Sequence, residues 1–274
     1  MPNDLNRRDV MKGGTVVFFS GAMSALETFL TGCASSASSI SSTPVGASAS
    51  CVASTNVTRG PYFVDNQSDP YISNDIVDSS IPERSDIRSD TKGSTGTQSG
   101  LPLTLTITVG SYTNGACSPI TNAQVHIWHC NAQGVYSNIE AGSNDDGANL
   151  IGENFLRGYQ YTDSSGKVNF TTIYPGWYSG RAVHIHVKVR LFDSSGNVTT
   201  EATTQLFFDD SVSMAVYAAN ASYSRSSTRN TMNADDSVYT SESPALLVGL
   251  NGSDSTSYAG GVSIGITTGT IYGG

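Results

Sequence analysis

Hydrophobic and polar residues alternate along several segments after residue 100. Leu101, Leu103, Leu105, Ile107 and Val109 are separated by proline and threonine residues, which is the period of two that a strand with one buried face produces. Further β-rich segments follow at residues 124–128, 158–162, 167–172, 184–191 and 203–208. The pattern predicts an all-β fold.

Turn signals punctuate these segments. Asp-Ser-Ser-Gly occurs at 163–166 and again at 193–196, and such residues favour tight turns. Hairpin-like turns at this spacing predict an antiparallel β-sandwich. A weak helical pattern covers Ser213–Ala221. Residues 51–100 carry no clear period, and because long irregular segments in a compact domain are usually functional, we expect long loops that cover a site.

The amino-terminal residues have the composition of an export signal. Arg7, Arg8 and Lys12 precede the mostly apolar residues 13–31, and a positive segment before an apolar one is typical of such signals. The arginine pair resembles a twin-arginine signal, which exports folded proteins. An ordinary secretory signal with a chance arginine pair is the alternative.

A lipid anchor is expected directly after this signal. Leu30-Thr31-Gly32-Cys33 resembles a lipobox, in which Cys33 is lipidated; a plain cleavage site beside a chance cysteine is the alternative. The following residues are rich in serine and alanine, as expected of a flexible tether. We therefore divide the chain into an export signal (1–32), a tether (33–50) and a β-sandwich domain (51–274), and expect a periplasmic or cell-surface location.

Composition narrows the possible partners. The chain has 274 residues, 14 Lys plus Arg against 23 Asp plus Glu, and a net charge of -9. An acidic chain without a basic run lacks the positive surface that nucleic-acid binding needs, so nucleic acid is not an expected partner. A hydrophobic content of 38% excludes global disorder, and nothing after residue 32 resembles a membrane-spanning segment.

Three cysteines remain once Cys33 is assigned to a lipid. Cys117 and Cys130 flank the predicted strand Ala123–Trp128, whose length of about 20 Å exceeds the ~7 Å between bridged Cα atoms. An exported protein can form disulfides, so we expect Cys51 to pair with one of the other two, with Cys130 preferred. Three buried thiols are the alternative.

The residues around 173–189 carry the most chemistry. His184 and His186 lie two apart on a predicted strand and therefore project from the same face, where both could bind one metal ion. Pro175-Gly176 precedes Tyr178 and sets a turn that could bring its phenol to the same point. Two imidazoles with phenolate oxygens suit ferric iron better than zinc.

At this point the sequence resembles the intradiol ring-cleavage dioxygenases, in particular the secreted branch of that family. Most of residues 51–250 are covered by matching blocks, which occur in the family order: Gly60-Pro61-Tyr62, Val125–Ser137, Asn154–Asp163, and Phe170–Tyr178 continuing to His184-Ile-His186. Shorter similarities lie at Arg84–Asp86 and Thr204–Phe208.

The resemblance implies a non-haem Fe(III) cofactor and a set of site residues. Tyr136, Tyr178, His184 and His186 would bind the iron. Tyr178, displaced when substrate binds, would act as a base, Arg181 would stabilise negative charge on the substrate, and Gln205 matches the active-site glutamine. The implied reaction cleaves a catechol-type ring with O2 to a cis,cis-muconate; which catechol, and which oligomeric state, stays open.

The same resemblance assigns the walls of the substrate pocket. Gly60, Pro61 and Tyr62 would form one side, and Trp177 would line the entrance or pack beneath the turn.

Two histidines outside the iron set receive separate predictions. His126 stands where the family usually has an acid, just as Arg59 does before Gly60, and we expect His126 at the surface. His129 is interpreted as structural and not as a ligand.

Two other functions are compatible with parts of the pattern. One is a non-catalytic β-sandwich lipoprotein that binds phenolics or carbohydrate and keeps a degenerate metal site. The complete set of two tyrosines, two histidines, Arg181 and Gln205 argues against it. The other is a zinc hydrolase built on His184 and His186, which lacks a third histidine or carboxylate near the pair.

Overall fold

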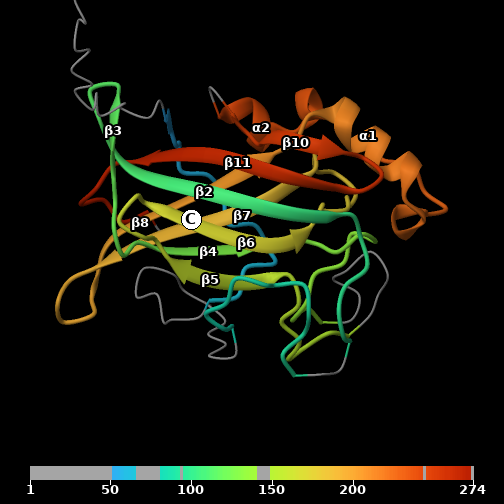
Figure 1. Ribbon diagram of the computed structural model, residues 1–274, viewed down its shortest axis with the longest axis horizontal. Helices are drawn as coiled ribbons and strands as arrows, with labels where there is room; N and C mark the ends of the chain where they lie inside the picture. The colour runs from blue at the N-terminus through green and yellow to red at the C-terminus, as the bar shows by residue number, and fades with distance from the viewer. Residues whose placement is uncertain (1–50, 66–80, 93–94, 141–148, 243–244, 273–274) are drawn as a thin grey trace, which may run out of the picture. The chain divides into compact units, whose positions relative to one another are not determined.

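The computed structural model describes residues 51–65, 81–92, 95–140, 149–242 and 245–272, all within one compact unit, Gly46–Gly274. Cys33, the export signal and the tether lie outside the described residues. The strands form two sheets, and in Figure 1 β2, β6 and β11 run in front of β4, β7 and β8. No helix within these ranges is long and apolar enough to cross a bilayer.

The first sheet has six strands. Its main path runs β1 (Val52–Ala53), β11 (Ser257–Ile266), β2 (Pro102–Thr113), β3 (Ala116–Pro119), while β6 (Lys167–Ile173) pairs with β2 and β10 (Gly249–Ser253) pairs with β11. The second sheet has five strands in the order β5 (Arg157–Tyr161), β4 (Gln124–Trp128), β7 (His184–Phe192), β8 (Val198–Phe207), β9 (Leu246–Leu247).

The all-β sandwich is confirmed, with one correction to strand direction. Most neighbours are antiparallel, but β11 runs parallel to both β2 and β1, and β9 runs parallel to β8. Strands β2 and β11 are far apart in sequence, so a hairpin turn does not constrain their direction. The first sheet is therefore mixed.

Among the described residues, the helices lie between β8 and β9. The weak helical pattern corresponds to α1 (Asp210–Ala219), which Asp209 caps by accepting hydrogen bonds from Ser211 N and Val212 N. Two short 3-10 helices, Ala221–Tyr223 and Asn233–Asp235, lead to α2 (Ser237–Ser241). This segment lies at one end of the sandwich (Figure 1).

The core lies between the sheets, as the alternation predicts. Leu103, Leu105 and Ile107 of β2 belong to the same buried cluster as Val187 and Val189 of β7. Both predicted Asp-Ser-Ser-Gly turns form: Asp163 and Asp193 each accept backbone hydrogen bonds from the residues two and four positions later.

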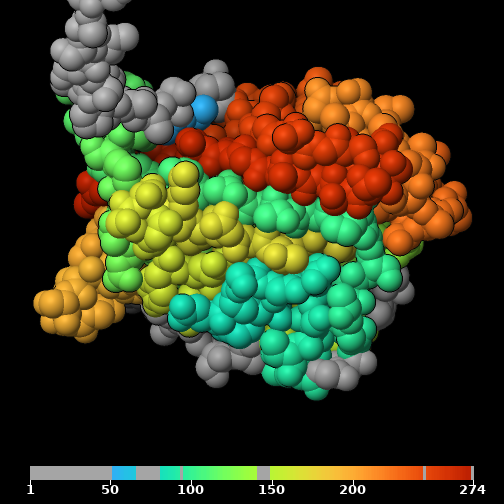
Figure 2. Space-filling model, in the orientation of Figure 1, coloured from blue at the N-terminus to red at the C-terminus, as the bar shows by residue number. Residues whose placement is uncertain are grey.

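Irregular segments cover the sandwich where the sequence shows no period. Glu83 forms a β-bridge with Tyr159 and Asp86 forms one with Thr171, so the segment that begins at Ile81 lies against β5 and β6 (Figure 2).

The disulfide differs from the predicted pairing. Cys51 is bonded to Cys117, with Cα atoms 6.1 Å apart, and Cys130 is buried and is not part of that disulfide. The distance argument against a bridge between Cys117 and Cys130 was sound, but the preference for Cys130 was wrong. Cys51 precedes β1 and Cys117 lies on β3, both in the first sheet, whereas Cys130 follows β4 in the second.

Candidate metal and active site

Strand β7 presents two imidazoles on the face that points away from the sandwich core. His184 and His186 are both buried, and their Nε2 atoms lie 3.0 Å apart. Ile185 and Val187 point to the opposite face and join the core cluster. The ring of His186 is stacked on Trp128 of β4, with centroids 4.8 Å apart, which holds the imidazole in place.

Two loops bring tyrosines to the same point. Tyr136 follows a turn in which the Asn131 side chain accepts hydrogen bonds from Gln133 N and Val135 N. Tyr178 follows Gly176, whose N–H donates to Asn131 O, so each loop supports the other. The Tyr178 hydroxyl lies 3.2 Å from His184 Nε2, and the Tyr136 and Tyr178 rings meet edge-on with centroids 5.7 Å apart.

The four side chains Tyr136, Tyr178, His184 and His186 therefore form what we call the Tyr–His cluster. The structure brings all four predicted ligands together. Within the described ranges no group of three or more His, Cys, Asp or Glu side chains could hold a metal ion; the donors here are two imidazoles and two phenols.

Protonation within the cluster fits a cation. His184 Nδ1 is 2.7 Å from the carbonyl oxygen of Ala182, so this nitrogen carries the proton and Nε2 carries a lone pair. Both His186 Nε2 and the Tyr178 hydroxyl approach that one lone pair. A cation at the point of convergence would accept both imidazole lone pairs and remove this conflict.

Burial also changes the pKa values of the cluster in a way that favours a bound cation. It lowers the pKa of His184 to about 3 and lowers the pKa of His186, so both imidazoles are neutral and able to bind a metal. Burial also raises the pKa of Tyr136 and Tyr178, so a phenolate needs a nearby positive charge to form at neutral pH. The donor set fits ferric iron.

Arg181 and Gln205 lie beside the cluster as predicted. Gln205 is the cross-strand neighbour of His186, and its Oε1 accepts a hydrogen bond from Arg181 Nη2 at 2.5 Å. Its Nε2 donates to Thr58 O at 3.0 Å. Burial is the largest cause of the lowered pKa of His184, and the positive charge of Arg181 is the second. Both side chains thus lie next to the histidines of the Tyr–His cluster.

The segment 60–62 forms a wall of the site. The Tyr62 ring is stacked on Tyr136 with centroids 4.6 Å apart and meets Tyr178 edge-on at 5.7 Å. Gly60 has φ +74°, and a Cβ there would lie 3.1 Å from His186 Cε1. Glycine therefore allows this segment to pass directly over the imidazole, while Pro61 is exposed.

Of the two alternatives for Trp177, the structure agrees with packing beneath the turn. Its side chain is buried and belongs to the core cluster between the sheets, and the Arg225 guanidinium lies 4.2 Å from the ring centroid. Arg225 also donates to Trp177 O at 2.5 Å. These contacts fix the backbone that leads into Tyr178.

The two remaining histidines have different outcomes. His129 is structural as predicted: it is buried, Nδ1 contacts Cys130 O and Nε2 contacts Thr172 Oγ1. The prediction that His126 lies at the surface was wrong, because it is fully buried. The face it shares with Trp128 is covered by Phe63, whose ring centroid is 6.0 Å away.

Sequence reasoning missed a buried network of four charged residues on the same face. Arg190 pairs with Asp65 and Glu201, and Lys188 donates to Glu201 at 2.7 Å. Lys188 and Arg190 continue the alternation of His184 and His186 along β7. This alternation could have predicted that all four side chains share one face. Asp65 lies three residues after Tyr62, so its ion pair with Arg190 of β7 holds the segment 60–62 close to the second sheet.

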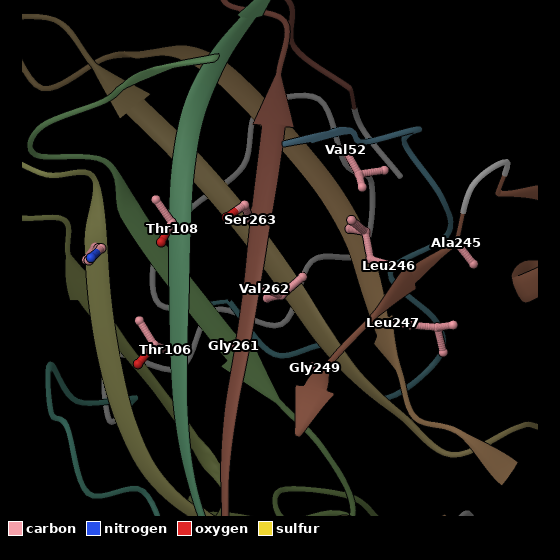
Figure 3. Close-up of a pocket in the computed structure, with 11 residues that line it drawn as sticks. Val52, Thr106, Thr108, Ala245, Leu246, Leu247, Gly249, Gly261, Val262 and Ser263 are labelled. Carbon is pink, nitrogen blue, oxygen red and sulfur yellow. The ribbon is translucent and has the colours of Figure 1, made fainter. Parts of the chain in front are cut away.

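A separate groove of about 530 Å³ lies on the first sheet, with no residue of the Tyr–His cluster (Figure 3). Thr106 and Thr108 of β2 line it on one side of β11 and Leu246 and Leu247 of β9 line it on the other (Figure 3), and Lys167 is its one titratable residue among those described. It lacks the donors of a metal site.

Comparison with known proteins agrees with this geometry. An intradiol ring-cleavage dioxygenase from Tetranychus urticae has a TM-score of 0.63 and 27% sequence identity, and the match covers 81% of this chain and 98% of that one. A family model described as Dioxygenase matches residues 81–243, more than half of the chain. The chain belongs to the intradiol dioxygenase family.

Two further solved structures are similar to this intradiol dioxygenase family member. A second dioxygenase has a TM-score of 0.62 and 26% identity over 81% of this chain and 98% of that one. The dioxygenase domain of a carbohydrate-binding fusion protein from Streptomyces sp. SirexAA-E has a TM-score of 0.49 and 22% identity over 79% and 99%. No curated protein sequence matches significantly.

Proposed function

We propose that the protein is a non-haem Fe(III) dioxygenase that cleaves a catechol-type ring between its two hydroxylated carbons, with both atoms of O2 entering a cis,cis-muconate product. The convergence of Tyr136, Tyr178, His184 and His186 carries this proposal. Ferric iron, when bound, would hold both substrate oxygens and make the ring reactive towards O2.

The side chains around the cluster have distinct roles in this proposal. Tyr178, as the phenolate that it would be when iron is bound, would accept a proton from a substrate hydroxyl, and burial makes this phenolate more basic because it raises the pKa of Tyr178. Arg181 places positive charge beside the ring, where negative charge develops during cleavage. Tyr62 limits the space next to Tyr136 and excludes water from that side.

Reconstitution with iron tests the proposal. We expect about one iron per chain, a visible tyrosinate-to-iron charge-transfer band, and O2 uptake with catechol, hydroxyquinol or protocatechuate. Tyr136→Phe and Tyr178→Phe should each bleach the band. Tyr174→Phe is the matched control, because Tyr174 is also buried but donates to or accepts from Ser213 in the core.

A folded protein that takes up zinc and no iron would contradict the proposal. A coloured protein that binds phenolics without consuming O2 would favour the non-catalytic binding protein instead.

We also propose that the protein is exported and held at a membrane by lipid on Cys33. The support is the sequence alone: the Arg7-Arg8 pair, the apolar residues after it and the lipobox-like residues 30–33.

A further inference from the structure

Two nitrogens of the Arg181 guanidinium donate hydrogen bonds to buried side chains. Nε donates to Asp236 Oδ2 at 2.8 Å and Nη2 donates to Gln205 Oε1 at 2.5 Å. No hydrogen bond joins Nη1 to any of the described residues, and the side chain is 17% exposed. The two bonds therefore fix the plane of the guanidinium and leave Nη1 available to a substrate.

Asp236 is a fully buried carboxylate in a loop far from Arg181 in sequence. Its Oδ2 accepts from Arg181 Nε and from Ala182 N at 2.7 Å, and its Oδ1 accepts from Val238 N and Tyr239 N at the start of α2. Both oxygens are thus hydrogen-bonded, as a buried carboxylate requires. The same residue caps α2 and orients Arg181.

The backbone donors also affect the charge at the site. Three of the four hydrogen bonds to the Asp236 carboxylate come from peptide N–H groups. These backbone donors share the stabilisation of the carboxylate charge with Arg181. The guanidinium therefore keeps positive potential at Nη1. A preorganised charge of this kind stabilises a transition state because it needs no reorientation during the reaction.

We propose that Asp236 is a positioning residue for ring cleavage, acting through Arg181. This inference rests on the proposed dioxygenase function. Asp236 acts at a distance from the substrate; it holds Arg181 by Nε so that the guanidinium charge stays near Tyr178 and His184. Without that bond the long side chain has several rotamers, and a displacement of about 1 Å in an active site can cost 10²-fold in rate.

Helix capping is the competing explanation for Asp236, and one variant separates the two roles. Asparagine caps helices as well as aspartate does, so Asp236→Asn can keep the acceptor for Val238 N and Tyr239 N. Its amide nitrogen would then face Arg181 Nε and Ala182 N, both of which are donors. The variant should keep α2 and release Arg181.

Turnover of the iron-loaded enzyme with catechol is the first measurement. Asp236→Asn should lower kcat about 10- to 100-fold with a smaller change in KM. Arg181→Ala should lower kcat about 10²-fold, and the double variant should be no slower than Arg181→Ala. Asp210→Asn is the matched control: Asp210 also pairs with an arginine, Arg229, and accepts from Asn233 N, but lies outside the site.

A second measurement needs neither iron nor activity. In the iron-free protein labelled with ¹⁵N-arginine, the Nε–Hε proton of Arg181 should exchange slowly with solvent because it is bonded to Asp236. Loss of the signal in Arg181→Lys assigns it. Asp236→Asn should make this exchange fast, and Asp210→Asn should not.

The outcomes are distinguishable. Wild-type protein that binds iron without O2 uptake would remove the proposed function itself. Active wild-type enzyme with equal kcat in Asp236→Asn and Asp210→Asn, or an additive double variant, would overturn the positioning role.

If Asp236→Asn does not fold, Arg181→Lys takes its place. It leaves Asp236 and the cap intact but cannot bond both Asp236 and Gln205 in one fixed plane. Wild-type kcat in Arg181→Lys would overturn the inference, and a loss close to that of Arg181→Ala supports it.

Discussion

Burial determines the protonation of every histidine in the chain. All four are buried, and His126 is the one that neither binds in the Tyr–His cluster nor hydrogen-bonds through a ring nitrogen to the described residues. Burial lowers its pKa to about 3; nearby Asp65 raises it, while Arg190, Arg157 and Lys188 lower it further. His126 is therefore neutral in the folded protein across the physiological range.

This burial makes His126 a source of acid lability. An unfolded histidine binds a proton near pH 6.5, whereas folded His126 does so near pH 3, so between these values the unfolded state binds more protons and stability falls as pH falls. By pH 5 the cost is about 2 kcal/mol. His126→Leu should reduce the loss of unfolding free energy between pH 7.5 and 5 by that amount.

Urea unfolding of the iron-free protein at both pH values measures the effect. Thr203→Val is the control, because Thr203 is buried on β8 of the same sheet and does not titrate; it should keep the wild-type pH dependence. Parallel pH profiles for wild type and His126→Leu would show that His126 is not the titrating group.

Arg181 provides a second prediction for a single residue. Its role depends on charge and not on coordination, so Arg181→Ala should keep the iron content, the colour and the spectral shift on catechol binding. Turnover should fall about 10²-fold, far more than substrate affinity. Steady-state O2 uptake alongside a catechol titration checks both values, and unchanged turnover with iron retained would exclude the role.

Residues could be predicted from the sequence where a local motif contains them. His184 and His186 follow from alternation on one strand, and Tyr178 from the turn before it. Asp236 could not be predicted in this way, because it is 55 positions from Arg181 and no local pattern links them. Asp65 and Arg190 are likewise joined only by the fold.

At the scale of elements, regular alternation was the reliable signal. Strands β2 and β7 were predicted because apolar residues occupy every second position. Strand β11 was missed, since its sequence Ser257–Ile266 includes three glycines and glycine hides the period. Yet Gly265 has a structural reason: a Cβ there would lie 2.9 Å from Cys51 Sγ and 3.0 Å from Cys117 Sγ, so the disulfide packs directly on the strand.

The disulfide should contribute substantially to stability. It joins residues 66 apart, and the loss of loop-closure entropy in the unfolded chain corresponds to about 4 kcal/mol. Cys117→Ser should lower the free energy of unfolding by roughly that amount.

Denaturant unfolding of the single and double variants measures this. Cys51→Ser should cost the same as Cys117→Ser, and the double variant no more than either. A different cost for the two single variants would point to packing of one thiol and not to the cross-link.

At the scale of the whole molecule, the proposed export signal and lipid anchor can be separated experimentally. Arg7→Lys combined with Arg8→Lys should retain precursor in the cytoplasm, because the twin-arginine route reads the arginine pair. Cys33→Ala should release a soluble form from the membrane fraction. Lys12→Arg and Ser35→Ala are the conservative controls, and fractionation of all variants like the wild type would refute both parts.

The parallel pairing of β2 with β11 has a consequence for how the protein is made. β2 is synthesised early, yet the edge that β11 covers stays open until nearly all of the domain has been translated, and open strand edges invite aggregation. A chain interrupted before β11 could not close its first sheet. On a route that exports only folded proteins, a chain without β11 would not be exported. Export would then select for complete chains as well as for folded ones.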